Sequence, residues 1–168
     1  LPPLPIGEAG QRVAGAHARL GWHWWPHPLA IASRPYRGRH GCVQRGTCPS
    51  GCNEGAKGST DVTHWPAFVA AGGVLVTGAR VRRILMNGAT HAGGVEWLDS
   101  TGRVRRQEAD IVLCAANGIG TPRLLLMSGE PVMDAANHSG LVGRRLMLHP
   151  TMRAVGLFRE PLGTWQGA

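Results

Sequence analysis

Apolar residues recur at helical spacing near the start of the chain. They follow one another at intervals of four, three and four residues: Ala9, Val13, Ala16 and Leu20. This spacing is typical of one stripe of an amphipathic helix, and Gly21 directly afterwards is a common residue at helix ends. The pattern predicts a helix over residues 8–20.

Residues 22–42 contain prolines that exclude regular structure. Pro26, Pro28 and Pro35 are incompatible with a continuous helix or a central strand, so we predict an extended loop. Its first residues include three tryptophans, Trp22, Trp24 and Trp25. We expect these rings to pack the loop onto the body of the protein, and the alternative is an aromatic cluster that faces a ligand.

Short β-type runs follow a glycine-rich stretch and a short predicted helix over residues 65–71. The runs cover residues 74–77, 80–86, 94–98 and 103–107. Asn87-Gly88 is a hairpin-type dipeptide, and an Asp-Ser-Thr-Gly turn follows Leu98. Together these features predict a small antiparallel meander.

A different unit follows the meander. Residues 109–114 (ADIVLC) form a continuous apolar run, as expected of a strand covered on both faces in a parallel sheet, so Cys114 is expected to be a packing residue. A turn of small residues leads into Thr121-Pro122, a suitable helix start, and Gly129 is a suitable stop. Strand, turn and helix in this order predict half of a nucleotide-binding α/β unit, with a ligand near the turn. A further strand is predicted over residues 152–158.

Composition narrows the function classes. The chain has 168 residues, 43% of them hydrophobic, which excludes a disordered polyelectrolyte, and no apolar run approaches the roughly 20 residues that span a membrane. The net charge is +8, from 18 basic and 10 acidic residues. Arginines gather at residues 80–83 and 103–106, where a solvated sheet face is favoured over a nucleic-acid surface because aromatic residues do not interleave with them.

Because the sequence opens on LPPLPIGEAG, without methionine or a signal peptide, we expect an internal piece of a longer protein, and the compartment is not inferable.

Three of the four cysteines could carry chemistry. Cys42, Cys48 and Cys52 are spaced C-x5-C-x3-C in a glycine-rich loop. Tetrahedral zinc would need a fourth ligand, for which His40 or His64 are available; three thiolates could instead hold an iron–sulfur cluster. Unligated or disulfide-linked cysteines remain the third alternative.

Other catalytic signals are sparse. No G-x-G-x-x-G, G-x-S-x-G or H-E-x-x-H occurs in the sequence. Among the histidines, His149 before Pro150 has the most site-like context, although a lone histidine is more often structural.

Taken together, the segments resemble the glucose-methanol-choline (GMC) oxidoreductases, flavoenzymes that oxidise alcohols. The resemblance runs in order through RGRHGCVQRGTCPSGCNEGAKGSTDVTHWP, GARVRRIL, ADIVLCAANGIGTPRLLLMSG and NHSGLVGRRLMLHP. It implies that Val81 contacts the FAD adenine through its backbone, and that Ala115, Ala116 and Asn117 form a turn near the dinucleotide. Asn117 stands where the family signature usually has glycine. The C-x5-C-x3-C loop is similar to one that binds a three-iron (3Fe-4S) cluster in a gluconate- and sugar-dehydrogenase-like branch of the family.

The resemblance implies an α/β fold, an FAD-binding Rossmann-like part with an α+β portion of a substrate domain. Residues 1–72 would belong to the substrate domain, residues 73–130 to the FAD domain, and residues 131–168 would begin the return into the substrate domain. The whole protein would move hydride from the CH–OH group of an alcohol, polyol or sugar to flavin N5, and an electron-acceptor protein or cytochrome subunit would be a partner.

The same resemblance implies that this chain alone is inactive, since it contains no catalytic residue. It lacks both the family's catalytic base and the glycine-rich turn that grips the FAD pyrophosphate. The alternative hypothesis is a small arginine-rich module that binds zinc or nucleic acid. The buried strand, small-residue turn and Thr-Pro helix favour the enzyme, and on that interpretation no nucleic-acid partner is expected.

Overall fold

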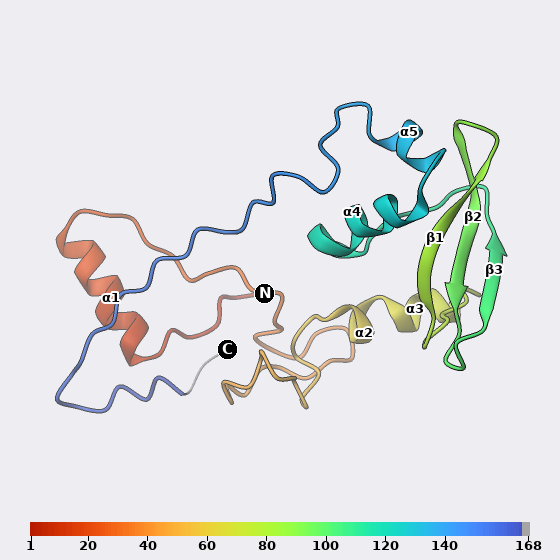
Figure 1. The fold of residues 1–168 in the computed structure, drawn as a ribbon. Coiled ribbons are helices and arrows are strands. Elements are labelled where there is room, and N and C mark those ends of the chain that lie inside the picture. The colour runs from red at the N-terminus through yellow and green to blue at the C-terminus, as the bar shows by residue number, and fades with distance from the viewer. Residues whose placement is uncertain (166–168) are drawn as a thin grey trace. The chain divides into compact units, whose positions relative to one another are not determined.

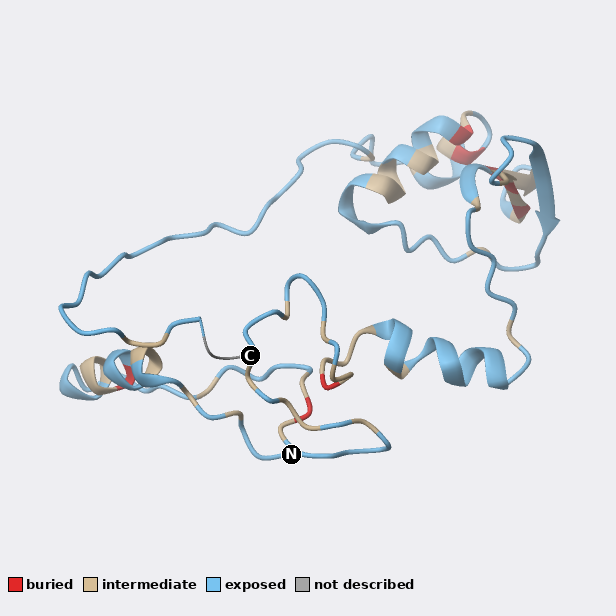
Figure 2. Ribbon diagram, turned by 90° about the horizontal axis from the view of Figure 1, so that it is seen from below, coloured by how far each residue is buried: buried red, intermediate tan, exposed pale blue. Residues whose placement is uncertain are grey.

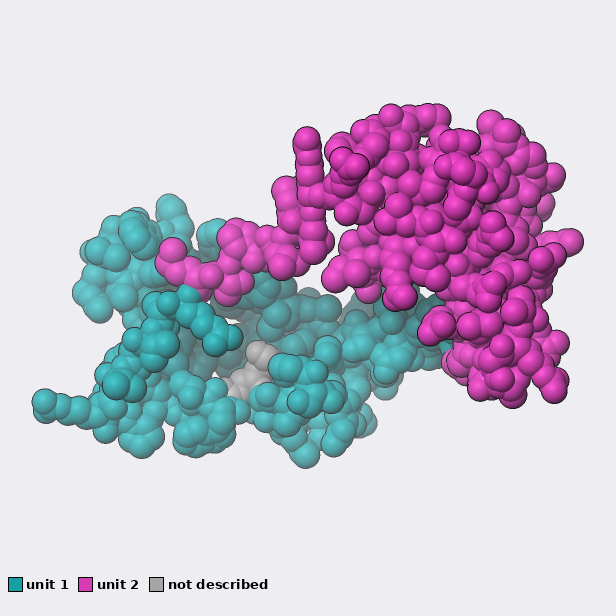
Figure 3. All heavy atoms as spheres, viewed as in Figure 1, with its two compact units in different colours: residues 1–75, 153–168 teal, residues 76–152 magenta. Residues whose placement is uncertain are grey.

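The computed structural model describes residues 1–165 and divides the chain into two units. Residues 1–75 together with the described part of 153–168 form unit 1, and residues 76–152 form unit 2 (Figure 3). These boundaries differ from the predicted divisions after residues 72 and 130. The assignment of the segments to FAD and substrate domains stays a prediction.

Unit 1 begins with the predicted helix, α1 (Glu8–Arg19) (Figure 1). Glu8 lies in the first turn and Arg19 in the last, where their charges complement the helix dipole. Its buried residue is Ala14, whereas Val13 of the predicted apolar stripe is 58% exposed. The helix is therefore confirmed, but the residue that it buries lies beside the expected stripe.

A long loop follows α1 and leads to two short helices, α2 (Thr60–Thr63) and α3 (Trp65–Ala70). Pro66 lies in the first turn of α3, as predicted, because its missing N–H costs nothing there. The tryptophans of the loop do not pack onto a body: Trp22, Trp24 and Trp25 are all exposed. Trp22 meets the His17 ring edge-on at 5.6 Å, so the packing expectation was wrong in this structure.

Unit 2 contains the predicted meander. β1 (Arg80–Asn87), β2 (His91–Leu98) and β3 (Val104–Glu108) pair antiparallel in the order β1-β2-β3. The Asn87-Gly88 turn joins the first two strands, and Gly88 has φ +73° there. The register of β1 against β2 shifts after Val81 and again after Leu85.

The other predicted strands are not formed. Residues 74–77, 109–114 and 152–158 have no strand structure, and Val74 and Leu113 are more than four-fifths exposed. Cys114 is exposed as well, so its expected packing role was wrong. The physical reason is that a strand needs a partner, and within residues 1–165 the only sheet is the three-stranded meander.

Two helices pack against β1: α4 (Asn117–Ser128) and α5 (Val132–Ala136) (Figure 1). Ile84 of β1, Ser128 of α4 and Val132 of α5 are buried and form the centre of this unit (Figure 2). The observed fold is thus a helix-covered antiparallel sheet, and the described residues do not contain the predicted parallel sheet. In the same part of the chain, no helix has the length and apolar character needed to cross a bilayer.

Candidate functional site

The turn before α4 carries three of the predicted cofactor residues. Ala115, Ala116 and Asn117 are all exposed, and their small side chains leave the backbone accessible to a ligand. Asn117 has φ +63°, a conformation that asparagine tolerates better than most residues. The structure thus places the predicted turn at the start of a helix, where an anion is favoured.

Side chains bind three backbone N–H groups of the turn and of the first helical residues after it. Asn117 Oδ1 accepts hydrogen bonds from the N–H groups of Ile119 (2.8 Å) and Gly120 (2.9 Å). Thr121 Oγ1 accepts one from the N–H of Ala116 at 3.1 Å. Thr121 was predicted to cap the helix, with Pro122 as its first residue. Instead α4 begins five residues earlier, at Asn117, whose own side chain binds N–H groups of the first helical turn.

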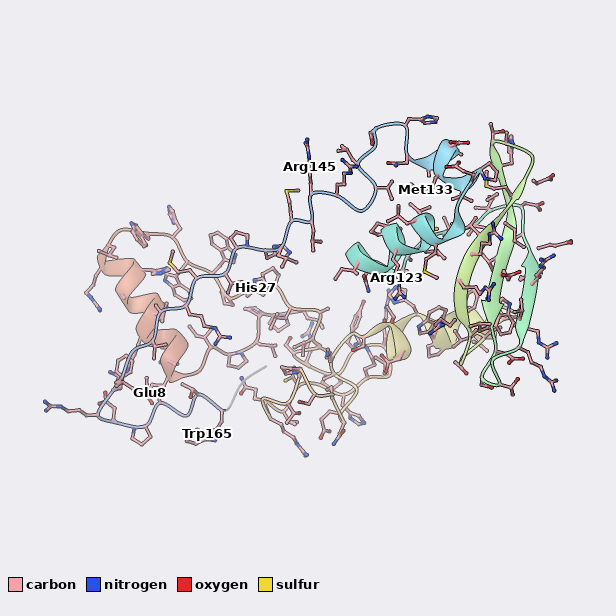
Figure 4. The ribbon with its side chains drawn as sticks, viewed as in Figure 1. Glu8, His27, Arg123, Met133, Arg145 and Trp165 are labelled. Carbon is pink, nitrogen blue, oxygen red and sulfur yellow. The ribbon has the colours of Figure 1, made fainter. Side chains whose placement is uncertain are left out.

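This capping changes what the turn can bind. Two of the first helical N–H groups are already satisfied, which leaves the N–H of Gly118 among those free for a ligand. An open hollow of about 430 Å³ lies beside Gly118, lined by apolar residues of α4, by Arg123 and by residues of the 143–146 segment. Arg123 is labelled in Figure 4. The turn is therefore better suited to close approach of a flat group than to binding one phosphate through many N–H donors. A cationic side chain lies nearby.

Val81, the fourth predicted cofactor residue, lies on the same unit. It pairs with Trp97 in the β1–β2 ladder and is directly followed by the first register shift. β1 is an edge strand, so its outer edge has backbone groups that the sheet does not use. The structure brings Val81 and the 115–117 turn into unit 2, on the two elements β1 and α4 that pack together.

Ser128 joins these two elements. Its hydroxyl accepts a hydrogen bond from the Ile84 N–H (2.9 Å) and donates one to the Leu124 carbonyl oxygen (2.7 Å). Arg83 Nε donates to the Ser128 carbonyl oxygen at 3.2 Å. Ser128 is 1% exposed, so its hydroxyl is shielded from solvent while it both donates and accepts a hydrogen bond.

Acidic residues neutralise part of the arginine-rich sheet. Glu96 on β2 is buried and pairs with Arg82 Nε at 3.0 Å and with Arg106 Nε at 3.3 Å. Asp99 accepts from Arg105 Nε at 3.1 Å. The sheet is therefore held by cross-strand ion pairs as well as by its backbone ladder.

Asp99 also organises the turn between β2 and β3. Its Oδ1 accepts hydrogen bonds from Thr101 Oγ1 (2.6 Å), from the Thr101 N–H and from the Arg103 N–H. These donors stabilise the ionised carboxylate and, with Thr101 Oγ1 as the largest contribution, lower the pKa of Asp99 to about 2.

Sequence reasoning missed Ser128 and Glu96 as organising residues. It placed Asp99 in a turn but did not identify the contacts of its carboxylate. An acidic residue between two arginine clusters is a signal that could have identified Glu96. Serine followed by glycine at a helix end gives no comparable signal, because it does not reveal what the hydroxyl contacts.

The cysteine loop lies in unit 1. Its centre is made of small residues: Ala32 and Ala56 are buried and are joined by a backbone hydrogen bond of 2.9 Å. Cys42, Cys48 and Cys52 are half-buried free thiols that line one hollow of about 120 Å³. The loop therefore faces all three cysteines toward a shared small space.

No metal site is formed there. In the described residues, no group of three or more His, Cys, Asp or Glu side chains is gathered closely enough to hold a metal ion. His64, a candidate zinc ligand, shares a hydrogen bond of 2.7 Å with Thr63 Oγ1. The three cysteines thus border one hollow without meeting closely enough for a metal ion within residues 1–165, and their assignment as metal ligands stays a prediction.

Backbone donors surround Cys52 instead. The Lys57 N–H lies 3.5 Å from its Sγ and, as the largest cause, lowers the pKa of the Cys52 thiol, with further help from the N–H groups of residues 54–56. Lys57 Nζ donates to the Cys48 carbonyl oxygen at 2.8 Å. Lys57 thus braces the loop through both its backbone N–H and its ammonium group.

His149 is not part of a formed site. It is exposed, and its carbonyl oxygen accepts a hydrogen bond of 3.4 Å from Thr151 Oγ1. The histidine that looked most site-like in the sequence therefore has no catalytic neighbours assigned by the structure.

Comparisons with known proteins match this chain to one family. Residues 27–151 match the family described as GMC oxidoreductase. A 2-methyl-1,2-propanediol dehydrogenase of Mycolicibacterium austroafricanum is 44% identical over 153 residues, which are 88% of this chain and 27% of that protein. A paromamine 6'-oxidase of Streptomyces fradiae is 33% identical over 95% of this chain and 30% of its own length. The fructose dehydrogenase large subunit of Gluconobacter japonicus is 30% identical over 99% of this chain and 30% of its own length. The chain thus spans less than a third of the length of each of these relatives.

Proposed function

The chain belongs to the GMC oxidoreductase family, and from this membership we propose that the whole protein is an FAD-dependent oxidoreductase that acts on the CH–OH group of its donor. The observation that carries the proposal is the family match over residues 27–151, because it includes both β1 and the turn before α4. The relatives support the donor class: one is named for 2-methyl-1,2-propanediol, one for paromamine and one for fructose. An alcohol, polyol or sugar is accordingly the proposed substrate, and an acceptor protein or cytochrome subunit a proposed partner.

We assign FAD contacts to residues of unit 2. The Val81 backbone would meet the adenine, and the Ala115–Asn117 turn would lie against the dinucleotide. The exposure and small size of these turn residues support close approach of a ligand. The departure at Asn117 has a physical meaning, since its carboxamide takes two N–H groups that glycine in that position would leave free.

The chemistry divides between the cofactor and the protein. When bound, FAD would supply the group that accepts a hydride from the CH–OH carbon, while a protein base takes the hydroxyl proton. This chain's residues bind and orient: β1 and the α4 turn hold the cofactor, and Asn117 and Ser128 hold that turn and its helix. We propose that the 168 residues alone are inactive, because the catalytic base and a G-x-G-x-x-G turn are not among them.

The metal assignment of Cys42, Cys48 and Cys52 rests on the resemblance in spacing alone, and we derive no step from it. Iron and labile-sulfide analysis of the anaerobically purified whole protein tests it. Iron and labile sulfide in a ratio of three to four, lost together in Cys48→Ser, would support a 3Fe-4S cluster. Absence of either from the wild-type protein would remove the cluster.

Flavin binding tests the main proposal. The whole protein should show flavin absorption bands after reconstitution with FAD, and these bands should bleach when an alcohol, diol or sugar is added under anaerobic conditions. The 168-residue chain, given the same donors and an artificial acceptor, should show no turnover. Absence of flavin bands in the whole protein would overturn the proposal.

A further inference from the structure

We propose that Ser128 is a positioning residue for the FAD site: it ties α4 to β1 and so fixes the 115–117 turn relative to Val81. This inference rests on the proposed function, since Val81 and the turn are the FAD contacts proposed above. Ser128 itself would touch no part of the cofactor, because it lies at the opposite end of α4 from the turn.

The hydroxyl of Ser128 makes two hydrogen bonds of different kinds. Donation to the Leu124 carbonyl oxygen stays within α4 and is common for serine in helices. Acceptance from the Ile84 N–H joins two elements that are far apart in sequence. Because β1 is an edge strand, no fourth strand of the meander pairs with this N–H, and Ser128 fills that place.

Arg83 adds a second tie at the same point. Its Nε donates to the Ser128 carbonyl oxygen, at the end of α4 where helical carbonyl groups lack partners within the helix. Gly129, with φ +65°, ends the helix immediately afterwards. Adjacent residues of β1, Arg83 and Ile84, thus hold the side chain and the carbonyl of one serine.

Because α4 is long, the Ser128 contacts with β1 affect the position of the 115–117 turn at the other end of the helix. Asn117 and Ser128 are eleven residues apart in α4, which is about 16 Å along the axis at 1.5 Å per residue. A pivot of about 10° at Ser128 would then move the turn by roughly 3 Å, while Val81, three residues from Ile84 on the same strand, would stay in place. This displacement would weaken the binding of a ligand that contacts both Val81 and the turn. It would leave unchanged the binding of a ligand that contacts β1 alone.

The experiment compares such a pair of ligands on the whole protein. FAD is titrated into the apoprotein by fluorescence and adenosine by calorimetry, for the wild type and for Ser128→Ala. We expect the Kd for FAD to rise about tenfold or more in the variant and the Kd for adenosine to stay within about twofold. Ser139→Ala is the matched control, since Ser139 is exposed and its hydroxyl accepts a 3.4 Å hydrogen bond from Leu141 N–H within a surface turn; its Kd values should match the wild type.

A purely structural role would lower the melting temperature of Ser128→Ala without changing the ratio of the two Kd values, and that result would overturn the inference. Arg83→Gln is the second variant if Ser128→Ala fails to fold, since Arg83 is exposed. It should raise the Kd for FAD about threefold with adenosine unchanged, and an unchanged ratio would again count against the inference. Failure of the wild type to bind FAD would instead overturn the proposed function, and this inference with it.

Discussion

The meander and the apolar runs beside it have similar β-type sequences but different structures. Residues 80–108 form three paired strands, whereas residues 74–77 and 109–114 remain without a partner in the described chain. Ile84 in the meander is 6% exposed, while Leu113 in the second run is 88% exposed. The more hydrophobic segment is therefore the less buried one.

The difference lies in where each segment finds its partner. Short turns at Asn87-Gly88 and at Asp99 bring the strands of the meander together locally, and antiparallel neighbours need no crossover. The two runs have no such turn to a complementary strand. An apolar pattern thus indicates that a segment is suited to burial, but burial also requires a partner strand or helix that covers the segment.

The largest effect is expected at Gly94, where a side chain on β2 would collide with the backbone of β3. Gly94 has φ +147°, and a Cβ there would overlap the Gln107 carbonyl oxygen. Gly94→Ala should therefore cost more than about 3 kcal/mol and unpair β3. Hydrogen exchange of the amides in β2 and β3 of the 168-residue chain measures this loss.

Leu113→Ser tests the unpaired apolar run 109–114, as Gly94→Ala tests the paired strands. Because the side chain is exposed, the change should alter amide protection by less than about 0.5 kcal/mol. A loss as large as that of Gly94→Ala would show that the run is paired after all.

The next effect is expected at Glu96. Glu96→Gln keeps a hydrogen-bond acceptor but removes the charge that Arg82 and Arg106 share, at a cost of about 1–2 kcal/mol. Urea unfolding of the chain measures it. Glu108→Gln on β3 is the control, since that residue is exposed, and an equal cost for both variants would contradict the role of the ion pairs.

Asn117 should respond differently to two small replacements. Asn117→Ala removes the cap and leaves a residue with a Cβ at φ +63°, which should cost about 1–2 kcal/mol. Asn117→Gly also removes the cap but relieves the backbone conformation, so its cost should be a few tenths of a kcal/mol. Thermal unfolding compares the two, and equal costs would mean that the positive φ is not retained.

The smallest effect on stability is expected at Asp99, and it appears only at acidic pH. The folded-state pKa of Asp99 is about 2, below that of the unfolded chain, so its contribution to stability is complete above about pH 4 and is lost as the pH falls toward 2. NMR titration of the Asp99 carboxyl should show this midpoint. In Asp99→Asn the corresponding pH dependence of stability should disappear, and a midpoint near 4 in the wild type would contradict the proposed turn.

Local signals predicted the local structure. The heptad-like spacing before Gly21, the Asn87-Gly88 dipeptide and Pro66 each indicated an element that is present, because each acts within a few residues. The start of α4 was misplaced because Asn117 competes with Thr121 for the cap, and sequence alone does not rank the two. The Ser128 junction could not be predicted, since it depends on contact with Ile84, 44 residues away.

The two edges of the meander differ in a way that bears on solubility. At β1, α4 covers part of the edge and Ser128 takes the Ile84 N–H. At β3 all five residues are exposed, and Arg105, Arg106 and Glu108 line it with charge. Covered on one side and charged on the other, the sheet discourages strands of other molecules from adding to it, so self-association of this chain should begin at the bare apolar runs rather than at the sheet.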